Sequence, residues 1–216
     1  MDIAIDAALA VSDLFSIPEG VLEYLAEPTV GGYGAAVAAL NAAQAGSPLT
    51  RRAIWAAIVA AKYAAAGSPS ACRFAAAAAR ESARRALELA HPAAREGAAV
   101  ARSLREAIVA EGESLHPCQC GEWVSNIEKR WQYCHDGPRG DLREYARWVH
   151  LSNAAKAAFW AANGGAEYGV SAEAAECMRA ISGEVPEMAA DAERAALLFE
   201  QAAADVQRML PPKVQS

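Results

Sequence analysis

Alanine constrains this chain more than any other residue type, because it accounts for about a quarter of the 216 positions. It has the highest intrinsic helix propensity, and its small side chain lets neighbouring helix axes approach closely. Proline and glycine interrupt the alanine-rich stretches, for example at Gly46-Ser47-Pro48 and Gly67-Ser68-Pro69. Because these connections are short, consecutive helices are expected to pack against each other in antiparallel orientation. The sequence therefore predicts an all-α fold, an Ala-rich antiparallel helical bundle of about eight to ten helices.

Three helices in the first half of the chain carry specific predictions. We expect the first from Ile3 to Phe15, and a later one that has Thr50 as its N-cap and ends near Ala66. Because this later helix is apolar on most sides, we place it in the middle of the bundle. The next helix is expected from Ser70 to Ala90.

The helix expected from Ser70 to Ala90 combines a stripe of small residues with a charged face. The charged face consists of Arg73, Arg80, Glu81, Arg84, Arg85 and Glu88. Glu81 and Arg85 stand four residues apart, a spacing at which opposite charges pair on a helix surface. We interpret this face as a solvated surface with local ion pairs, with binding of an anion or a partner as the alternative.

Two long helices are expected in the last third of the chain. Asp141 to Glu144 has the form of a capping box, and it opens a helix that ends near Ala162 with Phe159 directed inward. The C-terminal helix carries an apolar stripe at alternating four- and three-residue steps, formed by Met188, Ala192, Ala195, Phe199, Ala202, Val206 and Met209. An intramolecular seam of the bundle explains this stripe, and a homodimer through residues 187–209 is the alternative.

Charge and the N-terminal sequence narrow the classes of function. The formal net charge is −6, whereas proteins that bind nucleic acids normally present a basic surface, so no nucleic-acid partner is expected. The N-terminus lacks the basic segment of a secretory signal, and glycine and proline interrupt the charge-free stretch from Thr29 to Thr50. Five cysteines, an odd number, in a chain without a secretory signal favour reduced thiols over a set of disulfides. We expect a soluble, cytoplasmic protein without a membrane partner, folded as a single helical domain over residues 1–216.

One segment, residues 111–145, differs from the rest of this domain. No alanine occurs between Ala110 and Ala146. The segment instead concentrates side chains that bind metals or line pockets, namely His116, Cys118, Cys120, Trp123, Trp131, Cys134 and His135. We therefore treat it as an elaboration of the helical domain and as the first place to look for function.

Zinc binding is the first chemical hypothesis for this segment, since cysteine and histidine form tetrahedral zinc sites. The candidate ligands are His116, Cys118, Cys120, Cys134 and His135. Trp123, Ile127 and Trp131 recur at four-residue intervals, which indicates a helix between the two groups of ligands. A straight helix would separate Cys120 from Cys134 by about 20 Å at 1.5 Å per residue. We therefore predict no cofactor, with zinc as the alternative.

Thiol chemistry is the second hypothesis, because thiolates are stabilised near helix N-termini and Cys118 and Cys120 precede the expected helix. His116 or His135 would then be the base. The sequence contains no glycine-rich phosphate loop, no Gly-x-Ser-x-Gly motif and no His-Glu-x-x-His motif. No catalytic residue is therefore assigned.

Partner binding is the third hypothesis. The candidate surface consists of Trp123, Trp131, Arg139, Arg143 and Arg147, and both residue types are enriched at interfaces. Arg143 and Arg147 stand four residues apart and share a helix face. An acidic protein surface or a small anionic ligand could bind there, with ordinary surface ion pairing as the alternative.

The stretch from Arg51-Arg52-Ala53-Ile54 to Arg84-Arg85-Ala86 resembles the Ala-rich helical immunity proteins of bacterial toxin systems. The resemblance covers about a sixth of the chain, and Trp55 stands where an acidic residue is expected. It implies a bacterial protein that acts by binding another protein. We predict a non-enzymatic helical binding or interaction protein, immunity- or adaptor-like. The alternative is a metal-binding or thiol-dependent enzyme or regulator that uses the Cys/His cluster of residues 116–135.

Overall fold

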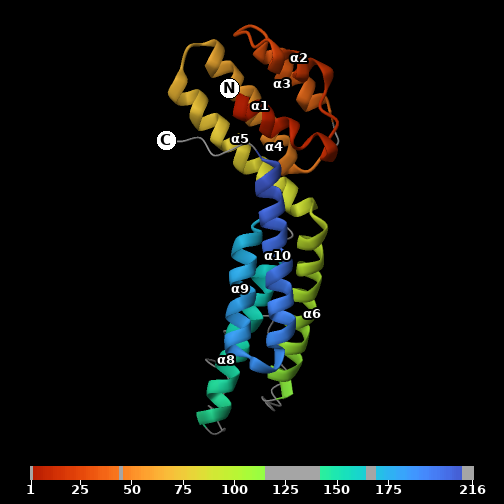
Figure 1. Ribbon diagram of the computed structural model, residues 1–216, viewed down its shortest axis with the longest axis vertical. Helices are drawn as coiled ribbons and strands as arrows, with labels where there is room; N and C mark the ends of the chain where they lie inside the picture. The colour runs from red at the N-terminus through yellow and green to blue at the C-terminus, as the bar shows by residue number, and fades with distance from the viewer. Residues whose placement is uncertain (1, 44–45, 115–141, 164–168, 211–216) are drawn as a thin grey trace, which may run out of the picture. The chain divides into compact units, whose positions relative to one another are not determined.

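The structure is a computed structural model that describes residues 2–43, 46–114, 142–163 and 169–210. Within these ranges all regular secondary structure is helical and no strand occurs, which confirms the all-α prediction (Figure 1). The same ranges contain nine α-helices and two short 3-10 helices. None of these helices is both long enough and apolar enough to cross a membrane.

The helices fall into two compact units, Met1–His91 with Ala202–Ser216, and Pro92–Gln201. Unit 1 contains α1 (Asp2–Leu9), η1 (Ser12–Leu14), α2 (Glu19–Ala26), α3 (Tyr33–Ala42), α4 (Pro48–Ala65) and α5 (Pro69–Ala90). Unit 2 contains α6 (Pro92–Ser114), α8 (Leu142–Asn163), α9 (Ser171–Glu184), η3 (Pro186–Met188) and most of α10 (Ala189–Met209). A single cooperative domain over residues 1–216 stays a prediction.

Helix α4 forms the centre of unit 1. Its buried side chains are Thr50, Ala53, Ile54, Ala56, Ala57, Ile58, Ala60 and Ala61. The helix packs along α5 and also contacts α1, α2 and α3. This arrangement confirms that the helix predicted to be apolar on most sides is an interior one. Alanine on its buried faces allows the surrounding helices to approach closely.

The start of α4 differs from the predicted N-cap at Thr50. The N-cap is Ser47, which has extended backbone angles and whose Oγ accepts a hydrogen bond of 3.1 Å from the Thr50 N–H. Pro48 occupies the first helical position, where its fixed φ suits a helix and its missing N–H leaves no bond unmade. Thr50 is instead buried inside the first turn.

The first helix is shorter than the predicted helix from Ile3 to Phe15. Helix α1 ends at Leu9, and the short helix η1 follows at Ser12–Leu14. At the junction the Ala10 N–H still donates to the Asp6 carbonyl at 2.8 Å, whereas the Val11 N–H donates to the Ala8 carbonyl at 3.3 Å. This change from four-residue to three-residue spacing tightens the chain and ends the α-helix.

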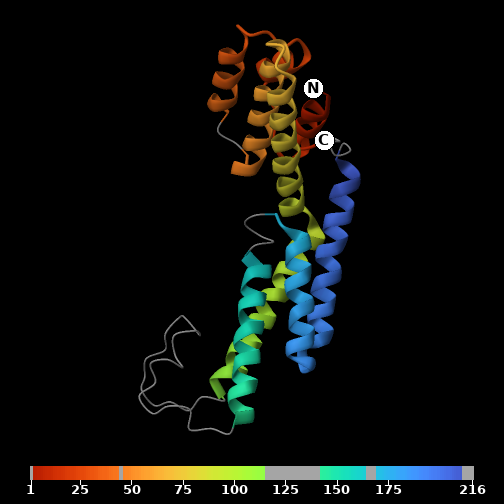
Figure 2. The same ribbon diagram turned by 90° about the vertical axis from the view of Figure 1, so that its left-hand side faces the viewer.

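Helices α6, α8, α9 and α10 lie side by side in unit 2 (Figures 1 and 2). Most of their buried side chains are alanine, and the largest fully buried one is Phe199 of α10. The Phe199 ring packs on the backbone of Gly97 in α6, where an added Cβ would lie 3.2 Å from the ring. Gly97 therefore lets α6 and α10 approach closely around this ring.

The apolar stripe predicted for the C-terminal helix is largely buried within one chain. Its fully buried members are Ala192, Ala195, Phe199, Ala202 and Val206. Met209, at the end of the stripe, is 57% exposed. The stripe therefore packs as an intramolecular seam. A homodimer through residues 187–209 stays a prediction, and it would have to use other side chains of α10 such as the exposed Leu197.

Candidate functional site

Most of the predicted site residues lie outside the described residues. These are His116, Cys118, Cys120, Trp123, Trp131, Cys134, His135 and Arg139. Arg143 lies in the first turn of α8, where only the backbone is described. The zinc and thiol hypotheses therefore stay predictions. Arg147 is the predicted site residue whose side chain the structure does describe.

Arg147 of α8 joins two other elements of unit 2. Its guanidinium donates hydrogen bonds to the carboxylate of Glu111 in α6 and, at 3.0 Å, to the carboxylate of Glu187 in η3. The pKa of Glu187 is lowered by its own backbone N–H and by Arg147. Because both donor edges of Arg147 already bind carboxylates, its main role in this arrangement is to connect α6, α8 and η3.

A groove of about 500 Å³ lies beside Glu187, between α6 and the beginning of α10. It is lined by Ala99, Val100, Ser103, Leu104, Ala107, Glu187, Met188 and Asp191. The residues on the α6 side are small or apolar, and the two carboxylates stand on the opposite side. This volume is in the range of pockets that bind small molecules.

The structure describes two of the five cysteines, and neither belongs to a metal-binding group of described residues. Cys72 is buried, and Cys177 is half-buried. Burial, with Glu176 and Glu173 as additional causes, raises the pKa of the Cys177 thiol, which lowers its thiolate fraction. Among the residues that the structure describes, no group of three or more His, Cys, Asp or Glu side chains is placed to hold a metal ion.

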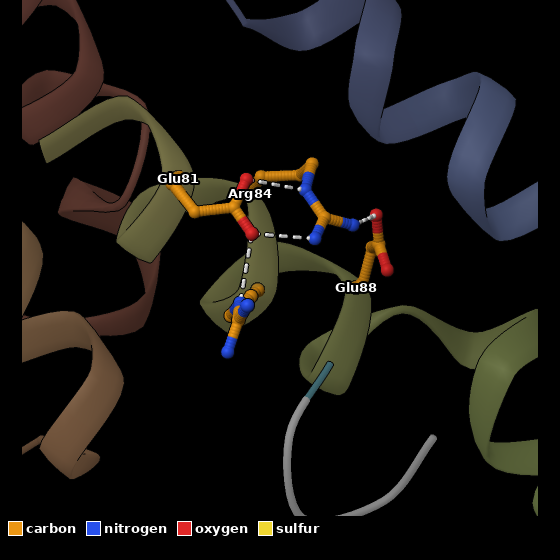
Figure 3. Close-up of polar contacts among 4 residues, drawn as sticks. Glu81, Arg84 and Glu88 are labelled. Carbon is orange, nitrogen blue, oxygen red and sulfur yellow. Dashed lines mark hydrogen bonds and ion pairs between the residues drawn. The ribbon is translucent and has the colours of Figure 1, made fainter. Parts of the chain in front are cut away.

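A network of ion pairs runs along α5 in unit 1 (Figure 3). Arg84 donates from Nη2 and Nε to Glu81, at 2.7 and 3.0 Å, and from Nη1 to Glu88 at 2.5 Å. Glu81 also accepts a hydrogen bond of 2.8 Å from Arg85, which confirms the predicted pair at four-residue spacing. The hydrogen bond from Arg84 is the main cause that lowers the pKa of Glu81 to about 2.

Two members of this charged face are not solvated, contrary to the sequence interpretation. Glu88 is 1% exposed and Arg80 is 6% exposed. The helical period correctly placed them with other charged residues, but it could not show which part of that face other elements cover. A carboxylate this deeply buried normally needs a cationic partner, and Arg84 supplies one.

Two aromatic side chains near the end of α8, Phe159 and Trp160, form a surface that the sequence analysis missed. Phe159 was expected to point inward, but it is 47% exposed, and Trp160 is 61% exposed. Their ring centroids lie 6.5 Å apart with an interplanar angle of 78°, an edge-to-face arrangement. The Arg105 guanidinium of α6 lies 5.5 Å from the centroid of Phe159. Three neighbouring alanines, Ala158, Ala161 and Ala162, are buried instead.

Comparisons with known proteins provide no relative for this chain: no family model, no curated protein and no solved structure matches it.

Proposed function

We propose that this chain is a non-enzymatic helical binding protein that binds another protein through the exposed aromatic surface of α8, formed by Phe159 and Trp160 with Arg105 of α6. The observation that carries this proposal is the exposure of both rings, 47% for Phe159 and 61% for Trp160. Exposed aromatic side chains next to an arginine are typical of the energetic centres of protein interfaces.

The composition of the core strengthens this argument. Aromatic residues make up only 7% of the sequence, and among the residues that the structure describes more than half of the buried apolar ones are alanine. Two of the few large rings nevertheless lie next to each other on the surface of one helix. A fully buried aromatic ring removes roughly 150–250 Å² from water. About half of this area is still exposed on each of these two rings, so a partner that covers both would bury a substantial apolar area.

The charges near the rings define the chemistry of the partner. Arg105 lies against Phe159, and Arg102 shares its helix face at three-residue spacing on α6. Both side chains are cationic. The partner is therefore expected to offer an apolar pocket bordered by carboxylates, and its association should weaken as salt is added.

Site-specific photocrosslinking tests this proposal. A photoreactive phenylalanine analogue at position 160 is compared with the same analogue at position 197, because Trp160 and Leu197 are equally exposed at 61%. In extracts of the cells that produce the protein, position 160 should give a discrete protein adduct that position 197 does not give. Adducts of the same identity and yield at both positions, or none at position 160, would contradict the proposal.

The affinity for the purified partner supplies the second measurement. Trp160→Ala should weaken binding by a factor of about 10 or more, as expected for a central aromatic residue of an interface. Leu197→Ala is the matched control and should leave the dissociation constant unchanged. Circular dichroism of both variants ensures that the comparison is made on folded protein.

A further inference from the structure

The groove between α6 and the start of α10 is a feature separate from the aromatic surface of α8. Its wall on α6 is formed by Ala99, Ser103 and Ala107, which recur every four residues and lie on one side of the helix. All three are exposed. The groove exists because these side chains are too small to reach across to Met188.

The groove is limited along α6 by ion pairs at both ends. Glu96 lies one turn before Ala99 and accepts a hydrogen bond of 2.5 Å from Arg194 of α10. Glu111 lies one turn after Ala107 and binds Arg147, which also holds Glu187. The arginines of these two ion pairs, Arg194 and Arg147, are therefore already bound to carboxylates.

The charge that remains in the groove is negative. Its lining contains two carboxylates, those of Glu187 and Asp191, and no basic side chain. Glu187 is paired with Arg147, whereas no described residue forms an ion pair or hydrogen bond with the side chain of Asp191. The carboxylate of Asp191 is exposed and open to a ligand. An anion would meet repulsion here, whereas a cation would be attracted.

We propose that this groove binds a small organic cation, in which an ammonium group is attached to a compact apolar body. The ammonium group donates to the carboxylate of Asp191, and the apolar body packs against Val100, Leu104 and Met188. Methionine adapts its shape easily, so Met188 can close on bodies of different outline. The volume of about 500 Å³ accommodates such a molecule.

Three probes that differ in charge but have similar apolar bodies test the proposal. They are 2-phenylethylammonium, 2-phenylethanol and 3-phenylpropionate, titrated into the full-length protein labelled with nitrogen-15. The cation should shift the amide resonances of residues 99–107 and 187–191, and it should bind more tightly than the alcohol. The anion should not bind. Equal affinity for cation and alcohol, or shifts scattered over the chain, would overturn the proposal.

Two variants and one control locate the binding energy. Asp191→Asn should weaken binding of 2-phenylethylammonium by a factor of about 2–5, since an ion pair to an exposed carboxylate is lost. Ser103→Trp should abolish binding, because the indole fills the groove from the exposed side of α6. Glu106→Gln removes an exposed carboxylate of α6 that does not line the groove, and it should leave the affinity unchanged. Unchanged affinity in Asp191→Asn would show that the cation is held elsewhere.

Discussion

Arg84 and Glu88 stand one turn apart on α5, and their side chains form a hydrogen-bonded ion pair of 2.5 Å in which the carboxylate is 1% exposed. The same arginine also binds Glu81, whose side chain is 45% exposed. Arg84 therefore connects a buried carboxylate to one at the surface. Its neighbour Arg85 forms an ion pair with Glu81 and with no other described residue. The Arg85 side chain is 40% exposed.

Substitution of these two arginines should have very different effects on stability. Arg84→Met leaves Glu88 buried without this guanidinium, and loss of one partner of a buried pair costs about 3–5 kcal/mol. Arg85→Met breaks an exposed pair and should cost less than about 1 kcal/mol. Urea unfolding of both variants measures the difference, and equal losses would show that Arg84 does not stabilise the buried carboxylate.

The ion pairs of Glu81 should make stability depend on pH on the acidic side. The pKa of Glu81 in the folded protein is about 2, below its ordinary value of 4.5, so its contribution is complete above pH 4.5 and is lost as the pH falls toward 2. The difference in unfolding free energy between the wild type and Glu81→Gln should therefore be largest near neutral pH. It should shrink between pH 4.5 and pH 2, and a constant difference would contradict the assignment.

Gly46 and Gly67 allow the cost of a side chain at positive φ to be compared with and without a steric clash. Both have φ in the left-handed region, +100° and +68°. A Cβ at Gly46 would lie 2.5 Å from the buried ring of Phe15, whereas a Cβ at Gly67 would meet nothing within 4 Å. Gly67→Ala should cost about 1–2 kcal/mol from backbone strain. Gly46→Ala should cost clearly more, and thermal unfolding of the two variants gives the comparison.

Gly97 tests how tightly α6 packs on Phe199. Gly183 in α9 has nothing within 4 Å of an added Cβ, so Gly183→Ala should stabilise the protein by about 0.5–1 kcal/mol through helix propensity. Gly97→Ala brings the same gain in helix propensity, but its added Cβ would press on the Phe199 ring. This substitution should therefore not stabilise the protein. Introduced together with Phe199→Leu, Gly97→Ala should become stabilising relative to Phe199→Leu alone. The unfolding free energies of the four variants decide the point.

The all-α class could be predicted because it depends on local properties that the sequence carries directly. Alanine favours helices, and the glycine and proline positions mark their ends. The ends themselves were harder to predict, since Ser47 and Thr50 are both good N-cap residues. Pro48 decides between them, because proline is favoured at the first helical position and thus points to Ser47 as the N-cap. This information is present in the sequence.

The exposure of Phe159 could not be predicted in the same way. The sequence interpretation placed Phe159 on the inward face of this helix. In this protein the neighbouring helices pack on Ala158, Ala161 and Ala162, and the ring is left on the other side. Burial of Glu88 was missed for a related reason, because helix periodicity shows which residues share a face but not what covers that face.

The alanine-rich core also determines which mutations this protein tolerates. In most proteins the damaging core substitutions remove atoms and leave a cavity. Here more than half of the described buried apolar residues are already alanine, so few atoms remain to be removed. Destabilisation comes mainly from substitutions that enlarge a buried side chain, because even the two methyl groups gained in Ala→Val must force closely packed helices apart. A random mutational scan should therefore be dominated by losses from side chains that grow, at positions such as Ala57, Ala158 and Ala195.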